Sequence, residues 1–270
     1  MLSVIILAKN ENESIKKTIE SVSFADETLI IDDDSTDNTV KIAKEMGVRV
    51  IAHPLNNDFS KQRNFADIQA KGDWILHIDA DEVITNALKE EIQEIVKTYK
   101  TFDEIPRQAR DDIGVYDEEG KTEIYYIKRR DIWWGRELRF GEVYKAAHTG
   151  FIRLYKKGSG KWIGAIHESF QTEKKTGFLD SYLIHRPHPT VAIFLEQINK
   201  YSSSRAEELF KTGQQGNALK IIFFPFFKFW YNYLLRFGFL EGAAGFVYAF
   251  FMSFHSFLVQ SKLYMMHHSK

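Results

Sequence analysis

The chain of 270 residues contains no cysteine, which excludes a disulfide scaffold, a zinc site built from thiolates and a cysteine nucleophile. It also lacks the glycine-rich turns of dinucleotide-binding and P-loop proteins, because its first strand-like segment leads into Ala8-Lys9-Asn10-Glu11. Positive charge is not in excess, since 36 lysines and arginines balance 37 acidic residues, and no nucleic-acid recognition motif is present. A dinucleotide-dependent oxidoreductase, a P-loop kinase or ATPase and a nucleic-acid-binding protein are therefore disfavoured.

The first nine residues also do not show the pattern of a signal peptide. Residues 1–9 have no basic region, no long apolar run and no small-residue cleavage site. Their continuous apolar pattern is instead typical of a buried strand. We therefore expect a protein on the cytoplasmic side of the membrane.

The composition is that of a folded globular protein, with 44% hydrophobic and 27% charged residues. Charge is distributed unevenly, because residues 1–100 contain 12 basic and 19 acidic residues whereas residues 101–270 contain 24 basic and 18 acidic residues. At roughly 150 residues per domain, the length allows one large domain with an appendage or two small domains.

Strand-like and helix-like segments alternate through the first hundred residues, which predicts a mostly parallel sheet with helices on its faces. The predicted strands are residues 2–7, 28–31, 48–52 and 73–78, and the predicted helices are residues 15–22, 35–46, 60–72 and the stretch that follows Thr85. Residues 103–122 are polar and aperiodic and are predicted as a loop, after which strands are expected at 123–128, 150–155 and 162–166 and a helix at 190–212. The pattern predicts an α/β fold of the nucleotide-binding type.

Two acidic clusters directly follow predicted strands, namely Asp32-Asp33-Asp34 and Asp79-Ala80-Asp81-Glu82. In an open parallel sheet, ligands bind beyond the carboxyl ends of the strands. Two carboxylates separated by one residue can serve two purposes there, one binding a hard divalent ion and the other accepting a hydrogen bond from a sugar hydroxyl. A solvated acidic loop would explain either cluster alone, but two clusters at equivalent strand ends favour a metal-assisted diphosphate site.

Four ordered motifs in the first hundred residues resemble those of the family-two inverting glycosyltransferases, which have the GT-A fold. They are Ser3-Val-Ile-Ile-Leu-Ala-Lys-Asn-Glu11, Ile30-Ile-Asp-Asp-Asp-Ser-Thr-Asp37, Phe59-Ser-Lys-Gln-Arg-Asn64 and Ile78-Asp-Ala-Asp-Glu82. Looser matches resemble the bacterial branch that builds lipopolysaccharide core and related surface glycans: Arg153-Leu-Tyr-Lys-Lys-Gly158, His167-Glu168, His185, Asn199-Lys-Tyr201 and Phe237-Gly-Phe-Leu-Glu-Gly242. The resemblance implies a Rossmann-like, mostly parallel sheet with flanking helices. Residues 1–100 would form the nucleotide-sugar-binding half, residues 101–215 the acceptor-binding half, and residues 216–270 a C-terminal helical region that associates with the membrane.

The resemblance also implies roles for individual residues around a nucleoside diphosphate sugar, for which we expect a UDP-sugar. Asp33 would bind the base, Ala8 and Lys9 would line it, and Asp79 would lie near the ribose. Arg63 would approach the nucleotide, and the nucleotide-sugar site would also include Glu11 and Ala80. Asp81 would bind Mn²⁺ or Mg²⁺, which neutralises the departing diphosphate.

Inverting transfer needs a base that deprotonates the acceptor hydroxyl, and Glu168 is the candidate. The alternative is a surface glutamate beside a structural histidine, His167. His185 and His188 could bind a metal, although two histidines in a loop are more often structural.

Basic and aromatic residues are interleaved between Lys128 and Lys161, where ten lysines and arginines accompany three acidic residues. Such a run can be merely a solvated face, but it also suits a cleft that attracts an anionic acceptor. Trp133 and Trp134 would then offer stacking surfaces. Arg153 and His167 are assigned to the acceptor site as well.

The last fifty residues contain 17 of the 39 aromatic residues. Residues 221–235 are interrupted by Pro225 and Lys228, whereas residues 242–260 carry no full charge and barely reach the length of a membrane span. We expect helices that lie in the membrane interface, where Lys220, Lys228 and Arg236 meet anionic headgroups. A buried helical pair packed on the catalytic domain, without a membrane, is the alternative.

The sequence therefore predicts a metal-dependent inverting glycosyltransferase, peripheral or monotopic at the inner face of the cell membrane. It would transfer a sugar to a lipid-linked or lipopolysaccharide-type glycan. One alternative is a sugar-phosphate nucleotidylyltransferase, which should have a glycine-rich, lysine-bearing first turn that is absent here. The other is a non-catalytic, membrane-bound carbohydrate-binding protein, against which the intact Asp79, Asp81 and Glu168 argue.

Overall fold

The computed structural model describes residues 1–104, 122–165, 168–187 and 190–268. The chain forms two compact units, the first made of residues 1–129 and 149–185 and the second of residues 130–148 and 186–270. The predicted functional division at residues 100 and 215 stays a prediction. Each unit has its own hydrophobic core.

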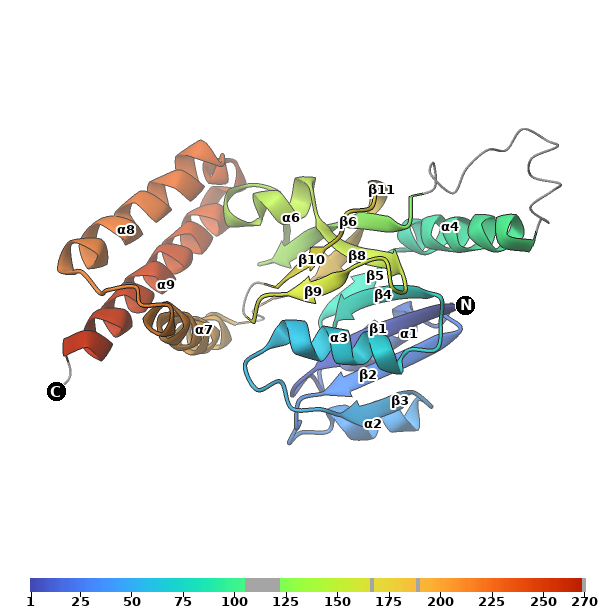
Figure 1. Cartoon of the computed structure of the whole chain (residues 1–270). Helices are drawn as coiled ribbons and strands as arrows, with labels where there is room; N and C mark the ends of the chain where they lie inside the picture. The colour runs from blue at the N-terminus through green and yellow to red at the C-terminus, as the bar shows by residue number, and fades with distance from the viewer. Residues whose placement is uncertain (105–121, 166–167, 188–189, 269–270) are drawn as a thin grey trace. The chain divides into compact units, whose positions relative to one another are not determined.

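The first unit is built on a mixed sheet in the strand order β3-β2-β1-β4-β8-β6-β11-β5 (Figure 1). Its first four neighbours are parallel, as the alternating pattern predicted: β1 (Leu2–Ala8), β2 (Glu27–Asp32), β3 (Arg49–Ala52) and β4 (Trp74–Asp79). The remaining strands are β5 (Glu82–Ile84), β6 (Ile124–Trp133), β8 (Phe151–Lys156) and β11 (Thr176–His185). Antiparallel pairing joins β8 to β4 and to β6, and β5 to β11.

Helices cover both faces of this sheet because alternate strand residues point to opposite sides. On one face, Val4 and Ile6 of β1 pack with α1 (Ile15–Ser21), α2 (Thr39–Glu45) and α4 (Asn86–Glu104). On the other face, Ile5 packs with α3 (Phe59–Gln69) and with a hairpin formed by β9 (Lys161–Ile163) and β10 (Ser169–Gln171). The predicted apolar stripe on α4 holds, since Leu88, Ile92 and Tyr99 are buried and Ile95 is half-buried.

Several predicted elements differ from the structure. The helix predicted at 35–46 begins only at Thr39, because Ser35 and Thr36 instead hydrogen-bond to Asn10 of the first loop. The strand predicted at 162–166 ends at Ile163, before Gly164 at a φ of 90°, a value that favours glycine. Four strands were not predicted from the sequence: β5, β7 (Arg136–Leu138), β10 and β11.

The second unit is mainly helical. After the β6–β7 hairpin, in which β7 is Arg136–Leu138, it contains η2 (Gly141–Val143), α6 (Tyr144–His148), α7 (Val191–Lys211), α8 (Ala218–Trp230), the π-helical turn η3 (Tyr231–Leu235), η4 (Gly238–Glu241) and α9 (Gly242–His268). Helix α9 packs against α7 and α8 (Figure 1). Phe194 and Ile198 of α7 meet Ala244 and Phe251 of α9 in its core.

Candidate functional site

Three parallel strands end at one edge of the sheet and bring the predicted nucleotide residues together. In the register of the sheet, Ala8 is opposite Asp32 and Leu7 is opposite Asp79. The residues that follow, Lys9, Asp33 and Asp81, therefore start from the same edge. This is the edge at which an open parallel sheet binds its ligand.

Asp33 and Lys9 form an ion pair at this edge, with 2.7 Å between Lys9 Nζ and Asp33 Oδ2. The other oxygen of Asp33 accepts a hydrogen bond from the backbone N–H of Leu55, and its own N–H donates to the carbonyl of the buried Ala8. These contacts fix the loops after β1 and β2 to each other. Asp33, Lys9 and Ala8, the three residues predicted at the nucleotide base, thus lie side by side.

Asp79 is held by two arginines from different elements. Arg153 of β8 donates to both of its oxygens, and Arg63 of α3 donates from NH2 to Oδ1 over 3.2 Å. Partial burial by itself favours the neutral acid, but the attraction of Arg153 and then of Arg63 outweighs it and holds the pKa of Asp79 well below its usual range. Asp79 is therefore an oriented carboxylate with its charge retained.

Arg63 also contacts Glu168, the candidate catalytic base, because its Nε donates to Glu168 Oε1 over 2.9 Å. Glu168 directly precedes β10, and the β9–β10 hairpin is held on α3 by Asn64, which donates to the carbonyl of Trp162 and accepts from its N–H. The Arg63 side chain is only 5% exposed and lies behind the two carboxylates. It connects Asp79 to Glu168, whereas its predicted contact with the nucleotide stays a prediction.

Glu82 is a site residue that the sequence analysis did not assign. It is fully buried, and its carboxylate accepts from Arg153 NH2 over 3.1 Å and from the backbone N–H of Asp79 over 2.9 Å. Its place directly after Asp81 in the acidic cluster was the available signal. Glu82 supports both Asp79 and the arginine that binds it.

Asp81, the predicted metal ligand, lies beside His185, with 3.1 Å between Asp81 Oδ2 and His185 Nε2. The pairing of β5 with β11 places His185 opposite Glu82, next to Asp81. Within the described ranges there is no cluster of three or more potential ligands. One carboxylate and one imidazole fit a divalent ion that takes its other ligands from a diphosphate and water, as magnesium sites often do. His188 lies outside the described residues.

Glu11 carries a perturbed pKa next to these carboxylates. Burial raises the pKa of Glu11 to about 7, and the negative charges of Asp81, Asp37 and Asp79 act in the same direction. The hydroxyl of Ser14 donates to Glu11 Oε2 over 2.6 Å and opposes the shift. Glu11 is thus poised to change its protonation state near neutral pH.

The predicted acceptor residues have very different environments. Trp133 is 2% exposed and packs against Trp134, Phe194 and Tyr248, so it is a core residue of the second unit and not a stacking surface. Trp134 is 52% exposed at the tip of the β6–β7 hairpin, where its φ of 50° and the 70° of Gly135 match a type I′ turn.

Arg153, also predicted at the acceptor site, is buried against Asp79, as described above. His167 lies outside the described residues.

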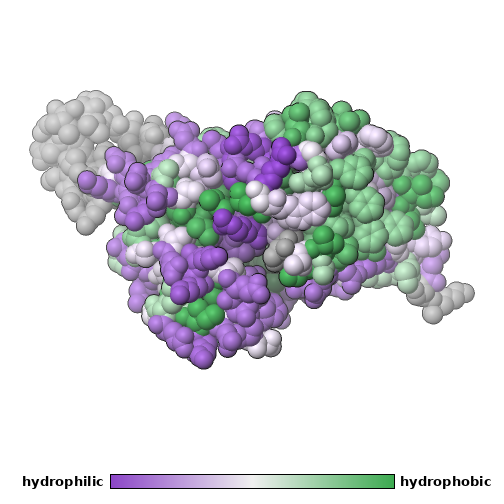
Figure 2. All heavy atoms as spheres, turned by 180° about the vertical axis from the view of Figure 1, so that it is seen from behind, coloured by the Kyte–Doolittle hydropathy of each residue, from purple (hydrophilic) through white to green (hydrophobic). Residues whose placement is uncertain are grey.

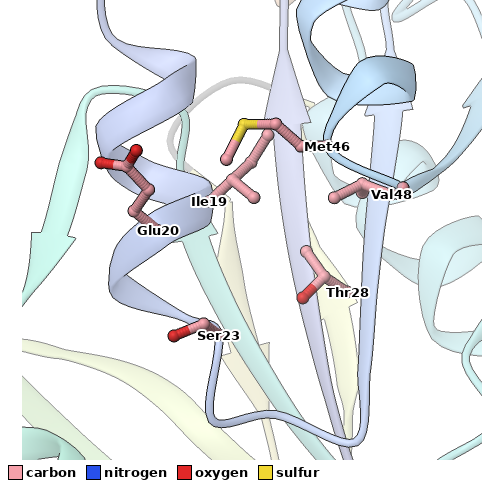
Figure 3. Close-up of a pocket in the computed structure, with 7 residues that line it drawn as sticks. Ile19, Glu20, Ser23, Thr28, Met46 and Val48 are labelled. Carbon is pink, nitrogen blue, oxygen red and sulfur yellow. The ribbon is translucent and has the colours of Figure 1, made fainter.

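A hollow of about 370 Å³ in the first unit does not belong to this site (Figure 3). It is lined by Ile19, Glu20, Ser23, Thr28, Met46, Gly47 and Val48. Thr28 is the second residue of β2, so the hollow lies toward the amino end of the strand, opposite to Asp32.

A family model described as glycosyl transferase family 2 matches residues 3–201. The chain belongs to this family. The mixed sheet, parallel from β3 to β4 and covered by flanking helices, is the GT-A-like fold that the motifs predicted, and the protein is a glycosyltransferase. The nucleotidylyltransferase and the non-catalytic binding protein are thereby set aside.

Relatives of this family 2 transferase match over nearly its whole length. An uncharacterised glycosyltransferase of Rickettsia typhi is 28% identical over 97% of this chain and 86% of its own length. The lipopolysaccharide core biosynthesis glycosyltransferase LpsC of Rhizobium meliloti is 27% identical over 98% of this chain and 93% of its own.

Similar solved structures include TarS residues 1–349 of S. aureus in complex with UDP-GlcNAc, with 13% identity, a TM-score of 0.47 and coverage of 100% of this chain and 92% of that chain. The glucosyl-3-phosphoglycerate synthase of Mycobacterium tuberculosis in complex with Mn²⁺, UDP and glucosyl-3-phosphoglycerate has 16% identity, a TM-score of 0.46 and coverage of 79% and 80%.

Proposed function

We propose that this family 2 transferase moves a sugar with inversion from a nucleoside diphosphate donor, a UDP-sugar, to a glycan acceptor. The observation that carries the proposal is that Arg63 joins Asp79 and Glu168 at the carboxyl edge of the parallel strands. A donor-binding carboxylate and a base are the two groups that a single displacement needs close together.

In this proposal the donor lies across the strand ends. Asp33 and Lys9 bind the nucleotide base, which Ala8 also lines. Asp79 accepts a hydrogen bond from a ribose hydroxyl. Asp81 and His185 would hold a divalent ion, which supplies charge neutralisation to the departing diphosphate. The ionised state of Asp79, maintained by Arg153 and Arg63, supports its role as an acceptor.

Glu168 is proposed to take the proton from the acceptor hydroxyl. The acceptor oxygen then forms a bond to the anomeric carbon while the bond to the diphosphate breaks, and the electron pair leaves with the diphosphate. Arg63 Nε donates a hydrogen bond to Glu168 Oε1 and so orients the carboxylate. Since a guanidinium stays protonated, the proton must remain on Glu168 until it leaves for solvent.

Glu168→Gln tests this role, because glutamine keeps the shape and the hydrogen bond from Arg63 but cannot take a proton. We expect transfer turnover to fall by about 10²-fold or more while donor affinity is unchanged. Glu173→Gln, which changes an exposed glutamate of the same unit, is the matched control. Loss of donor affinity without loss of turnover per bound donor would make Glu168 a binding residue.

We further infer that the acceptor is a lipid-linked or lipopolysaccharide-type glycan and that the second unit rests on the membrane surface. No residue of α8 is buried, and Phe223, Phe226, Phe227 and Trp230 are all more than 40% exposed. Hydrophobic side chains gather over this part of the molecule in Figure 2. An exposed aromatic surface of this kind suits a lipid interface.

Residues Gly238–His268 are long and apolar enough for a membrane span, because an 18-residue stretch within them has a mean hydropathy of 1.5. However, α9 packs against α7 as well as α8, and Lys262 near its end donates to Asn199 and Ser202 of α7. This packing favours a helix pair lying in the interface over a helix that crosses it. The Nζ of Lys228, a residue predicted to meet headgroups, lies 2.8 Å from Glu142 Oε2.

A further inference from the structure

A second hydrogen-bonded network lies beneath the Asp79–Arg63–Glu168 cluster, and the proposed function gives it no role. It consists of His77 on β4, Asp67 on α3, Tyr155 on β8 and Trp162 on β9. Asp67 lies one helical turn after Arg63, so both side chains leave the same face of α3. His77 contacts both of them.

The hydrogen-bond directions in this network are fixed by its chemistry. His77 Nδ1 is 3.2 Å from Arg63 NH1, and a guanidinium can only donate, so Nδ1 must accept. The ring is therefore neutral, with its proton on Nε2, and this N–H donates to Asp67 Oδ1 over 2.7 Å. Asp67 also accepts from the hydroxyl of Tyr155, which in turn accepts from Trp162 Nε1 over 2.8 Å.

The His77 ring has no room to turn. It is fully buried, lies nearly parallel to the Tyr155 ring with 5.9 Å between centroids, and meets Trp162 edge-on at 5.6 Å. Trp162 also packs against the Arg63 guanidinium at 4.9 Å. Burial lowers the pKa of His77, and although the carboxylate of Asp67 opposes this shift, the charges of Arg63 and Arg153 act in the same direction as burial. The net effect favours the neutral ring that the hydrogen bonds require.

Each nitrogen of the Arg63 guanidinium donates to a different partner: Nε donates to Glu168, NH1 to His77 and NH2 to Asp79. Because the guanidinium is planar, fixing NH1 fixes the directions of the other two nitrogens. We propose that His77 is a positioning residue, whose Nδ1 holds Arg63 in the orientation that aligns Glu168 with Asp79. This inference rests on the proposed function for the roles of those two carboxylates.

Two amide substitutions separate the roles of the two imidazole nitrogens. In His77→Asn the amide oxygen takes the place of Nδ1 and keeps an acceptor for Arg63, but the donor to Asp67 is lost. In His77→Gln the amide nitrogen takes the place of Nε2 and keeps the donor to Asp67, but Arg63 loses its acceptor. Both variants lose ring packing, so they form a matched pair for stability.

We expect turnover of His77→Asn to stay within about threefold of the wild type and that of His77→Gln to fall by about tenfold or more, because small misplacements at a reacting centre are costly. Both should have lowered melting temperatures, and donor KM should rise more in His77→Gln because Asp79 is also misaligned. Tyr155→Phe, which breaks the far end of the network, should lose stability but keep turnover. Equal turnover and equal KM in the two His77 variants would overturn the positioning role.

A measurement on the wild-type protein keeps the inference testable where a variant folds poorly. Nitrogen-15 NMR of the histidine-labelled protein at neutral pH should show one buried ring protonated on Nε2 alone. A His77 ring protonated on Nδ1, or on both nitrogens, would contradict the inference. Glu168→Gln measured in parallel separates the two proposals: if that variant keeps wild-type turnover, the base assignment fails, while a donor KM that differs between the two His77 variants still supports positioning through Asp79.

Discussion

Arg153 binds Asp79 with both terminal nitrogens of its guanidinium: NH2 lies 2.8 Å from Oδ2, and NH1 lies 3.3 Å from Oδ1. This fork is the geometry in which arginine binds a carboxylate most strongly. The same NH2 reaches the fully buried Glu82. One arginine of β8 therefore supports two carboxylates that lie three residues apart at the end of β4 and the start of β5.

We predict that Arg153→Met destabilises the fold by about 3–5 kcal/mol, because it leaves Glu82 as a buried charge with a weakened set of partners. Urea denaturation measures the change. Arg139→Met is the control, since Arg139 is 56% exposed beside Glu137, and its effect should stay below about 0.5 kcal/mol. Adding Glu82→Met to Arg153→Met should recover part of the loss, and a double variant that is less stable than the single one would contradict this explanation.

The proposed metal site at Asp81 and His185 gives a second prediction. Calorimetric titration with Mn²⁺ in the presence of UDP should show no binding to Asp81→Asn and roughly tenfold weaker binding to His185→Ala, because each removes one of two protein ligands. The control is Asp73→Asn, whose side chain is 74% exposed. An unchanged Mn²⁺ affinity in Asp81→Asn would remove the metal from this site.

The sequence predicted the edge of the sheet where the site forms but not how its residues pair. The alternation of strand-like with helix-like segments and the acidic clusters are local patterns, so they placed Asp33, Asp79 and Asp81 at strand ends before any contact was known. The inward turn of Arg63 depends on partners far along the chain, since Glu168 is 105 residues away. No local pattern records such a contact.

The two adjacent tryptophans show the same limit. They were predicted as equivalent stacking surfaces, yet Trp133 ends β6 pointing into the core of the second unit whereas Trp134 occupies the turn. What buries Trp133 is Phe194 of α7 and Tyr248 of α9, which lie far along the chain. β11 escaped prediction for a related reason, because only two of its ten residues, Leu179 and Leu183, are buried.

Glu11 predicts how stability depends on pH. Its folded-state pKa of about 7 exceeds the 4.5 of an unperturbed glutamate, so the folded protein keeps a proton that the unfolded chain has released. This group therefore reduces stability as the pH rises from about 4.5 to about 7. Glu11→Gln should gain stability over the wild type at about pH 8 but little at about pH 5. The exposed Glu13→Gln should change little at either pH, and urea denaturation at the two values decides.

The exposed face of α8 predicts binding to a lipid surface. Phe226 and Phe227 are 56% and 62% exposed, and Lys220 lies over the ring of Phe224, where a cation can meet anionic headgroups. The double variant Phe226→Ser/Phe227→Ser should bind vesicles of anionic lipid about tenfold more weakly, because two aromatic rings no longer enter the interface.

Lys220→Gln should weaken the same binding about fivefold, equivalent to about 1 kcal/mol, and only on anionic vesicles. Phe178→Ser, which removes an equally exposed phenylalanine (59%) of the first unit, is the control and should not change binding.

Co-sedimentation with vesicles measures the binding of all three variants. The wild type is then washed with high salt or carbonate. Release by the wash indicates helices in the interface, retention until detergent is added indicates a span through α9, and no binding by the wild type would mean that the aromatic face does not meet lipid.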